Sequence, residues 1–255
     1  MNEPGGDRLP HFVCVGTQKG GTTTLHALLS GHPQVFLPQE KELHFFSLHY
    51  GRGPRWYGNH FLRAAPDQIR GEITPYYLFH PEAPRRIQAL LPQARLIVLL
   101  RDPVARTLSQ YFHSYRLGLE TLDLEAALRV EPVRLMGSSA CLVADDGRHP
   151  SHQEHSYLAR SRYEQQLPRY LQRFSAGQLL LLRSEDLFQQ PLLVWRQLLL
   201  FLQLDPQPLP PMVAANRGDG EDKTVSRPVR NWIRDQLDST YRLMEQSYGI
   251  RWDPP

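Results

Sequence analysis

The sequence predicts an α/β protein of three layers, in which helices cover both faces of a central parallel sheet. Three observations lead to this prediction. Short apolar runs recur along the chain, a polar break and a helical pattern follow each of them, and the first break is rich in glycine. Strands that alternate with helices in this way form parallel sheets, because each crossover returns the chain to the same end of the sheet.

The first strand is expected over residues 11–16, "HFVCVG", which is apolar and ends at a glycine. A helix follows in "TTTLHALLSGHP", residues 22–33, where leucines recur on one helical face before glycine and proline end the pattern. The loop between them therefore joins a buried strand to the start of a helix.

Two further strands repeat this arrangement. Residues 94–103, "ARLIVLLRDP", form an apolar run, and Pro103 suits the first turn of the helix that follows. Residues 178–187, "QLLLLRSEDL", precede a helix that begins at Pro191. The remaining pattern predicts helices over residues 81–91, 163–174 and 227–249, a proline-rich connector over residues 205–211 and a loop over residues 216–227.

Length and composition fit one globular domain over residues 1–255. A chain of this size can bury roughly three quarters of the surface that its unfolded form exposes. Apolar residues make up 41% and charged residues 22%, which excludes the disordered and fibrous classes. The net charge of +3 fits an anionic ligand but is too small to indicate nucleic acid.

Compartment is inferred from the cysteines and from apolar segments. Cys14 and Cys141 are far apart in the chain, which favours a reducing compartment over a disulfide framework. Residues 1–10 lack the apolar segment of a signal peptide, and no window approaches the roughly 18 apolar residues of a membrane span. We expect a cytoplasmic protein without a membrane span.

The first loop has the features of a phosphate-binding loop. Gly16 and Gly21 have the separation of a Walker loop, but Thr22 stands where the Walker lysine belongs, and Lys19 lies within the loop instead. Converging amides and the start of the helix still favour an anion there. A lysine inside the loop can reach the bridging oxygen of a leaving phosphate without a metal ion. A purely structural turn is the less favoured alternative, because all parts of the motif coincide.

The string "VGTQKGGTTTLHALLSGHP" resembles the loop by which sulfotransferases hold 3′-phosphoadenosine 5′-phosphosulfate (PAPS), most of all in the heparan sulfate N- and 3-O-sulfotransferases and their bacterial relatives. This resemblance implies a P-loop-type three-layer fold and an enzyme that uses PAPS and releases adenosine 3′,5′-bisphosphate (PAP). It also assigns the 5′-phosphosulfate end to Gln18, Lys19, Gly20, Gly21, Thr22 and Thr23.

PAPS carries a second phosphate, on the ribose, and the string "LLRDPVARTLSQYFH" fits it. Arg101 ends its strand and Ser109 lies two helical turns further, which resembles the family's signature for that phosphate. An arginine can hold a phosphate by two parallel hydrogen bonds. Pairing of Arg101 with Asp102 at a strand end is the structural alternative.

The proposed base lies in "QEKELHFF". This string resembles the family's Glu-x-His-Phe-Phe segment and assigns Glu42 as general base, His44 as its partner and Phe45 to the acceptor wall. Alternatively, Glu42 and His44 are exposed loop residues without a catalytic role, and the aromatic residues belong to the core.

A second acceptor-side segment is "GEITPYYLF", which resembles a family stretch beside the acceptor cleft. Glu72 is the second choice of base and a predicted acceptor contact, whereas Ile73 replaces a lysine and weakens the analogy to an anionic sugar. The resemblance further places Tyr163 near the nucleotide, and Lys223 and Arg227 in an adenine loop whose usual motif is not visible.

Other functions stay open. A P-loop kinase would need the Walker lysine and a magnesium carboxylate, and a non-catalytic module could bind a glycan or nucleotide without turnover. His149, His152 and His155 have helical spacing, but no cysteine or well-placed carboxylate completes a metal site, so no metal is predicted. The predicted partner is an acceptor, a carbohydrate or a small metabolite, and no nucleic acid.

Overall fold

A computed structural model describes residues 8–212 and 224–252. Lys223 and most of the loop expected over residues 216–227 lie outside the described residues. Within the described part, none of the helices combines the length and the apolar character that crossing a bilayer would require.

Five parallel strands form the central sheet in the order β2-β3-β1-β4-β5. Their bounds are β1 (Phe12–Gly16), β2 (Val35–Phe36), β3 (Ile69–Ile73), β4 (Arg95–Leu100) and β5 (Leu179–Arg183). The chain first winds to one side of β1 and then crosses to β4 on the other side. The carboxyl ends of β1 and β4 therefore flank the switch point, where ligands bind in open α/β sheets. The predicted α/β class is confirmed.

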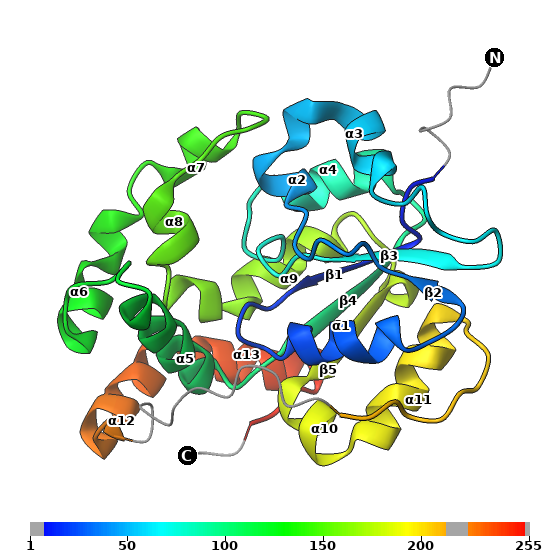
Figure 1. Ribbon diagram of the computed structural model, residues 1–255. Helices are drawn as coiled ribbons and strands as arrows, with labels where there is room; N and C mark the ends of the chain where they lie inside the picture. Colours follow the sequence, from blue (N-terminus) through cyan, green and yellow to red (C-terminus); the bar gives the residue numbers. More distant parts are fainter. Residues whose placement is uncertain (1–7, 213–223, 253–255) are drawn as a thin grey trace.

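Helices cover both faces of this sheet, as Figure 1 shows for α1 and α11 on one face. The side chains of β1 alternate between two apolar clusters: Phe12 and Cys14 face one, and Val13 and Val15 face the other. The first cluster packs against α1 (Thr22–Ser30), α10 (Ser184–Gln189) and α11 (Pro191–Leu202). The second packs against α4 (Ala83–Leu90), α5 (Pro103–Arg116), α9 (Tyr163–Leu171) and α13 (Asp238–Tyr248).

Short helices surround the carboxyl ends of the strands. Those at the upper side in Figure 1 are α2 (Phe45–Leu48), the 3-10 turn η1 (Tyr50–Arg52) and α3 (Gly53–Asn59). Near α5 lie α6 (Leu124–Arg134) and α8 (Pro150–Glu154), and α7 (Ser138–Leu142) lies beyond α8, further from α5 (Figure 1). The 3-10 turns η2 (Ala159–Ser161) and η3 (Ala176–Gln178) flank α9.

Two expected elements differ from the structure. The last helix, expected over residues 227–249, is divided into α12 (Arg227–Gln236) and α13. The break falls at Leu237, which is fully buried, and the two helices pack on different partners, α12 on α5 and α13 on α9. The strand expected over residues 178–187 ends at Arg183, because Ser184 already begins α10 with acidic residues in its first turn.

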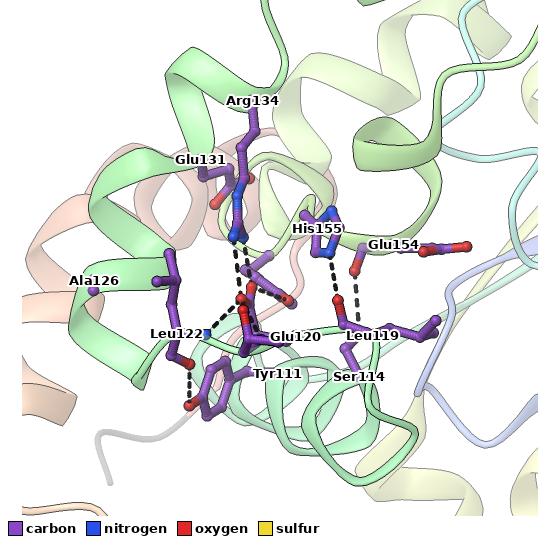
Figure 2. Close-up of polar contacts among 12 residues, drawn as sticks. Tyr111, Ser114, Leu119, Glu120, Leu122, Ala126, Glu131, Arg134, Glu154 and His155 are labelled. Carbon is purple, nitrogen blue, oxygen red and sulfur yellow. Dashed lines mark hydrogen bonds and ion pairs between the residues drawn. The ribbon is translucent and has the colours of Figure 1, made fainter.

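A buried carboxylate fastens the α6 to α8 region to the end of α5 (Figure 2). Glu120 accepts hydrogen bonds from Arg134 at 2.5 and 3.1 Å, from the Tyr157 hydroxyl at 2.8 Å, and from the amides of Thr121 and Leu122 at 2.9 Å. Burial alone would raise the pKa of Glu120, but the hydrogen bonds from Arg134, Leu122 and Tyr157 outweigh it and lower that pKa to about 2.

We expect Glu120→Gln to lower the free energy of unfolding at pH 7 by roughly 3 kcal/mol, because Arg134 loses its charged partner. The stability that the Glu120 carboxylate contributes is present above its unfolded pKa of about 4 and disappears as pH falls toward 2. Urea unfolding should therefore show a difference between the variant and the parent protein that is largest at pH 7 and smaller at pH 3, where the folded carboxylate, with a pKa of about 2, is still mostly ionised.

The matched control is Glu125→Gln, also near the start of α6. Glu125 is exposed and lies 3.9 Å from Arg129, so its loss should change stability by about 0.5 kcal/mol or less. Equal losses in the two variants would contradict the role given to Glu120.

Candidate active site

The β1–α1 loop, residues 17–21, turns tightly against the end of β4. The Thr17 amide donates to the Leu99 carbonyl at 2.8 Å, and the Gly20 amide donates to the Thr17 carbonyl at 3.0 Å. A Cβ atom on Gly20 would lie 2.6 Å from the Leu99 carbonyl oxygen. Only glycine fits at this position, and its absent side chain lets the loop approach the switch point.

The loop leads into the first turn of α1, which contains no acidic residue and has no side-chain cap. Thr22 is buried, and the Thr23 hydroxyl accepts a 2.6 Å hydrogen bond from the ammonium group of Lys41. The positive end of the α1 dipole and the charge of Lys41 therefore both add positive potential at the first turn of α1. Sequence reasoning missed Lys41, although it directly precedes Glu42 in the Glu-x-His-Phe-Phe segment.

Arg101 follows β4 and reaches the same loop. Its guanidinium donates to the Lys19 carbonyl at 3.1 Å, while its own carbonyl accepts a 2.8 Å hydrogen bond from the Tyr163 hydroxyl. Tyr163 is fully buried, so it supports Arg101 from behind rather than facing a ligand, unlike the nucleotide contact that was expected. Ser109 lies half-buried on α5, two turns beyond Arg101.

Positive charge is concentrated at Lys19. Burial, together with the nearby charges of Arg116, Arg101 and Arg106, lowers the pKa of Lys19 to about 8. The carboxylate of Glu42 partly opposes this decrease, which places Glu42 within electrostatic range of Lys19. An anion bound here would relieve the repulsion among the cations.

Backbone strain marks the same residues. Among the described residues, the non-glycine residues with positive φ are Lys19 at 68°, Glu42 at 60°, His44 at 53° and Gln203 at 58°. Gln203 simply ends α11 in the left-handed conformation. Such backbone strain costs of order 1–3 kcal/mol and clusters at functional sites. The three remaining strained residues are those predicted to be catalytic.

Glu42 and His44 lie side by side. The Glu42 carboxylate is 3.7 Å from His44 Nε2 and 3.6 Å from the Lys41 ammonium group, and 37% of its side chain is exposed. Burial and the charges of His49, Arg160 and Arg148 lower the pKa of His44 to about 4, so its imidazole is neutral at pH 7. Glu42 is thus an accessible carboxylate with a neutral imidazole beside it.

Glu72 is not accessible. Its carboxylate accepts hydrogen bonds from the hydroxyls of Tyr57, Thr74 at 2.7 Å and Tyr77 at 2.6 Å, and 1% of the residue is exposed. Burial raises its pKa in spite of these hydrogen bonds. The expectation that Glu72 contacts the acceptor is wrong for this structure, because three neighbouring residues cover both carboxylate oxygens.

Phe45 is also buried, and the expectation that it contacts the acceptor requires correction. Its ring stacks on Tyr57 with the centroids 4.3 Å apart and belongs to the core beneath the Glu42 segment. Trp56 stacks on Phe45 with the centroids 6.2 Å apart and is only partly buried, and the Arg52 guanidinium lies 4.9 Å from its ring centre. Tyr50, at 5.4 Å from Phe45, is also partly buried. Trp56, Tyr50 and Arg52 are therefore accessible members of this aromatic cluster.

Buried arginines hold the surrounding segments. Arg106, the second arginine of the Arg-Asp-Pro-x-x-Arg-x-x-Ser signature, donates to Ser161 and to the Tyr157 carbonyl, and no part of it is exposed. Burial lowers the pKa of Arg106 to about 9. The Ser161 hydroxyl also contacts the Thr107 hydroxyl at 2.8 Å and so completes this internal network. The Gln18 side chain accepts a hydrogen bond from Arg160, which sequence reasoning also missed.

The three histidines of "HPSHQEH" have separate structural partners. His149 caps α8 by accepting from the His152 amide at 3.1 Å, and His155 donates to the Leu119 carbonyl at 3.0 Å. His152 shares a 2.8 Å hydrogen bond with the Tyr76 hydroxyl. Within residues 8–212 and 224–252, no three histidine, cysteine, aspartate or glutamate residues are grouped so that they could hold a metal ion.

The adenine contacts expected at the end of the chain are less defined. Arg227 is exposed at the first residue of α12, the helix that packs on α5. Lys223 lies outside the described residues.

Comparison with known proteins identifies the family. The family model for the sulfotransferase domain matches residues 9–237. The chain belongs to the sulfotransferase family. Human heparan sulfate glucosamine 3-O-sulfotransferase 6 is 44% identical to this sulfotransferase over 108 residues, which are 42% of this chain and 31% of the human protein. Mouse heparan sulfate glucosamine 3-O-sulfotransferase 3A1 is 32% identical over 190 residues, 74% of this chain and 44% of the mouse protein.

The fold has a close counterpart among solved structures. A sulfotransferase from Alicyclobacillus acidocaldarius superimposes with a TM-score of 0.73 at 25% identity, covering 92% of this chain and 96% of that one. The chain described here, by contrast, spans less than half the length of the two curated relatives named above. The sulfotransferase fold is therefore matched over almost the whole chain.

We expect Gly20→Ala to lower the free energy of unfolding by about 1–3 kcal/mol, because the added Cβ forces the β1–α1 loop away from Leu99. Gly177→Ala, in η3, is the control, since a Cβ there meets no atom within 4 Å. Urea unfolding of both variants tests the expectation. If the two variants were equally stable, the β1–α1 loop would be able to move away from Leu99 without loss of folding free energy, and the expectation would be wrong.

Proposed function

We propose that this sulfotransferase transfers the sulfuryl group of PAPS to a hydroxyl or amine of a carbohydrate acceptor. The observation that carries the proposal is the 3.1 Å hydrogen bond from Arg101 to the Lys19 carbonyl. It joins two anion-binding groups, one after β1 and one after β4, and PAPS has two anionic ends. A nucleoside triphosphate has one phosphate chain and would need the Walker lysine that Thr22 replaces.

The residues present fit PAPS. The amides of the β1–α1 loop, the positive end of α1 and Lys19 suit the 5′-phosphosulfate. Arg101, directly after β4, and Ser109, on α5, suit the ribose 3′-phosphate. The lowered pKa of Lys19 supports this assignment, since, after burial, it reflects the charges of Arg116, Arg101 and Arg106, which a multiply charged anion would neutralise.

When bound, PAPS supplies a sulfuryl group that passes in line to the acceptor and leaves PAP. Lys19 is mostly protonated at pH 7 and would donate to the bridging oxygen on which charge develops. Glu42 would take the proton from the acceptor, since its carboxylate is accessible and lies within electrostatic range of Lys19. His44, which is neutral, would orient Glu42, and Lys41 would hold both Glu42 and the first turn of α1.

A carbohydrate acceptor is supported by two facts. The relatives named above are heparan sulfate sulfotransferases. Trp56, partly exposed beside the Glu42 segment, offers an aromatic face of the kind on which sugar rings stack. Ile73 adds no charge to the acceptor side, because its side chain packs in the core below α1.

We expect PAP to bind without magnesium and more tightly than adenosine diphosphate. Arg101→Ala should weaken PAP binding by roughly 10- to 100-fold, the effect of losing hydrogen bonds to a charged group. Arg85→Ala, at an exposed arginine that pairs with Glu82, should leave binding unchanged. Calorimetric titration measures all three proteins. Equal affinity for the diphosphate, or a requirement for magnesium, would overturn the assignment of PAPS as donor.

We expect Glu42→Gln to lower kcat by about 10²–10⁴, the usual contribution of a general base, while PAP binding is retained. Transfer from radiolabelled PAPS to desulfated glycosaminoglycans measures kcat. Glu40→Gln, two residues away at a side chain that is 70% exposed, is the control and should keep normal activity.

Two results would contradict the assignment of Glu42. Full activity of Glu42→Gln would remove its role as the base. PAP binding without turnover on any acceptor, in the parent protein as well, would instead favour a non-catalytic binding module.

A further inference from the structure

We propose that Arg160 is a positioning residue that fixes the β1–α1 loop through Gln18 and so aligns Lys19 with the sulfuryl donor. This inference rests on the proposed function. It assigns a role in donor binding to a residue on η2, far from the loop in sequence and outside both anion-binding motifs.

The guanidinium of Arg160 makes contacts on two sides. One terminal nitrogen donates to the side-chain oxygen of Gln18. The other donates to the carbonyls of His152 at 2.9 Å and Gln153 at 2.8 Å, both on α8. Arg160 therefore bridges the residue next to Lys19 and the helix α8.

Aromatic rings complete the surroundings of Arg160. Its guanidinium lies 5.1 Å from the ring centre of Tyr76 and 5.2 Å from that of Phe79. His152 fixes these rings in turn, since it stacks on Phe79 at 4.1 Å and hydrogen-bonds Tyr76. This packing leaves the guanidinium little freedom to move away from Gln18.

The charge of Arg160 is costly where it lies. The residue is 2% exposed, and its Nε atom has no hydrogen-bond partner among the described residues. None of its hydrogen bonds in the described part goes to a carboxylate. A buried cation without a carboxylate partner destabilises a fold unless its hydrogen bonds are very well formed. A role beyond packing would account for an arginine here.

Arg160 is also placed to affect the reacting groups. Its charge contributes to the lowered pKa of His44, after burial and His49, and the charge of Glu42 acts in turn on Arg160. The ring of Tyr76, over which Arg160 lies, is 5.9 Å from the ring of His44. Arg160 thus contacts the donor loop directly and is separated by one aromatic ring, that of Tyr76, from His44, the partner of the proposed base.

A lysine cannot replace this arginine. The flat fork of a guanidinium can donate to Gln18 and to two α8 carbonyls at once, whereas an ammonium group is a single point on a flexible stem. Arg160→Lys therefore keeps the charge but loses the bridge between the loop and α8.

A double-mutant cycle on PAP affinity tests the proposal. Calorimetric titration with PAP compares the parent protein, Arg160→Lys, Gln18→Ala and the double variant. Each single variant should weaken PAP binding about tenfold, as expected for one hydrogen bond to a charged group. The double variant should bind no more weakly than either single variant, because both changes break the same contact. With acceptor present, the KM for PAPS should rise while the KM for the acceptor stays constant.

Arg169→Lys is the matched control. Arg169, on α9, donates to the carbonyls of Leu78 and Phe79 and, among the described residues, to none of the loop. This variant should lower the unfolding temperature and leave PAP affinity unchanged.

The outcomes separate a positioning role from a structural one. Unchanged PAP affinity in Arg160→Lys, or single effects that multiply to about a hundredfold in the double variant, would overturn the proposal. If Arg160→Lys does not fold, Gln18→Ala decides, since unchanged affinity there removes the contact from donor binding. A parent protein that does not bind PAP refutes the proposed function itself, which is a different result.

Discussion

The structure depends on the close approach of Gly20 to the carbonyl of Leu99. β1 and β4 are neighbouring parallel strands, so the loop after β1 and the residues after β4 emerge at the same edge of the sheet. A side chain at position 20 would push the loop away from β4. Because the loop lies against β4, Arg101 can reach the Lys19 carbonyl, and the two anion-binding groups become one site.

Around this site, buried arginines hold short helices and the loops between them. The last carbonyl oxygens of a helix have no partner within it, and those of a loop have none in regular structure, yet each must still be hydrogen-bonded when buried. Arg86 donates to the carbonyls of Phe46, Ser47, Val143 and Ala144, and thereby fastens the segment after His44 to the chain between α7 and α8. Arg106 and Arg160 do the same for the segments around η2 and α8. The many donors of arginine suit this task better than the single ammonium group of lysine.

The sequence predicted those features that local patterns determine. A glycine-rich break between a strand and a helix, and an arginine after the next long apolar strand, were sufficient to locate Lys19 and Arg101 beside one another. The local pattern did not distinguish buried from accessible side chains at Glu72 and Phe45, although their partners Thr74, Tyr77 and Tyr57 lie within 15 residues of them. The burial of Tyr163 depends on Arg101, 62 residues away, and so could not be read from local sequence. Lys41 and Arg160 were missed for a similar reason, since their partners, Thr23 and Gln18, become neighbours only in the folded sheet.

The strained residues show how function constrains the backbone at this site. Glycine would adopt the left-handed conformation at positions 19, 42 and 44 without cost, but it would remove the ammonium group, the carboxylate and the imidazole that the proposed reaction requires. At position 20 the requirement is reversed, because the backbone must be free of any side chain. The loop thus places two opposite requirements next to each other. Lys19 keeps its side chain although its backbone conformation is strained, whereas Gly20 must have no side chain so that its backbone can approach Leu99. Two large apolar clusters on either face of the sheet provide the stability against which this local strain, of order 1–3 kcal/mol at each residue, can persist.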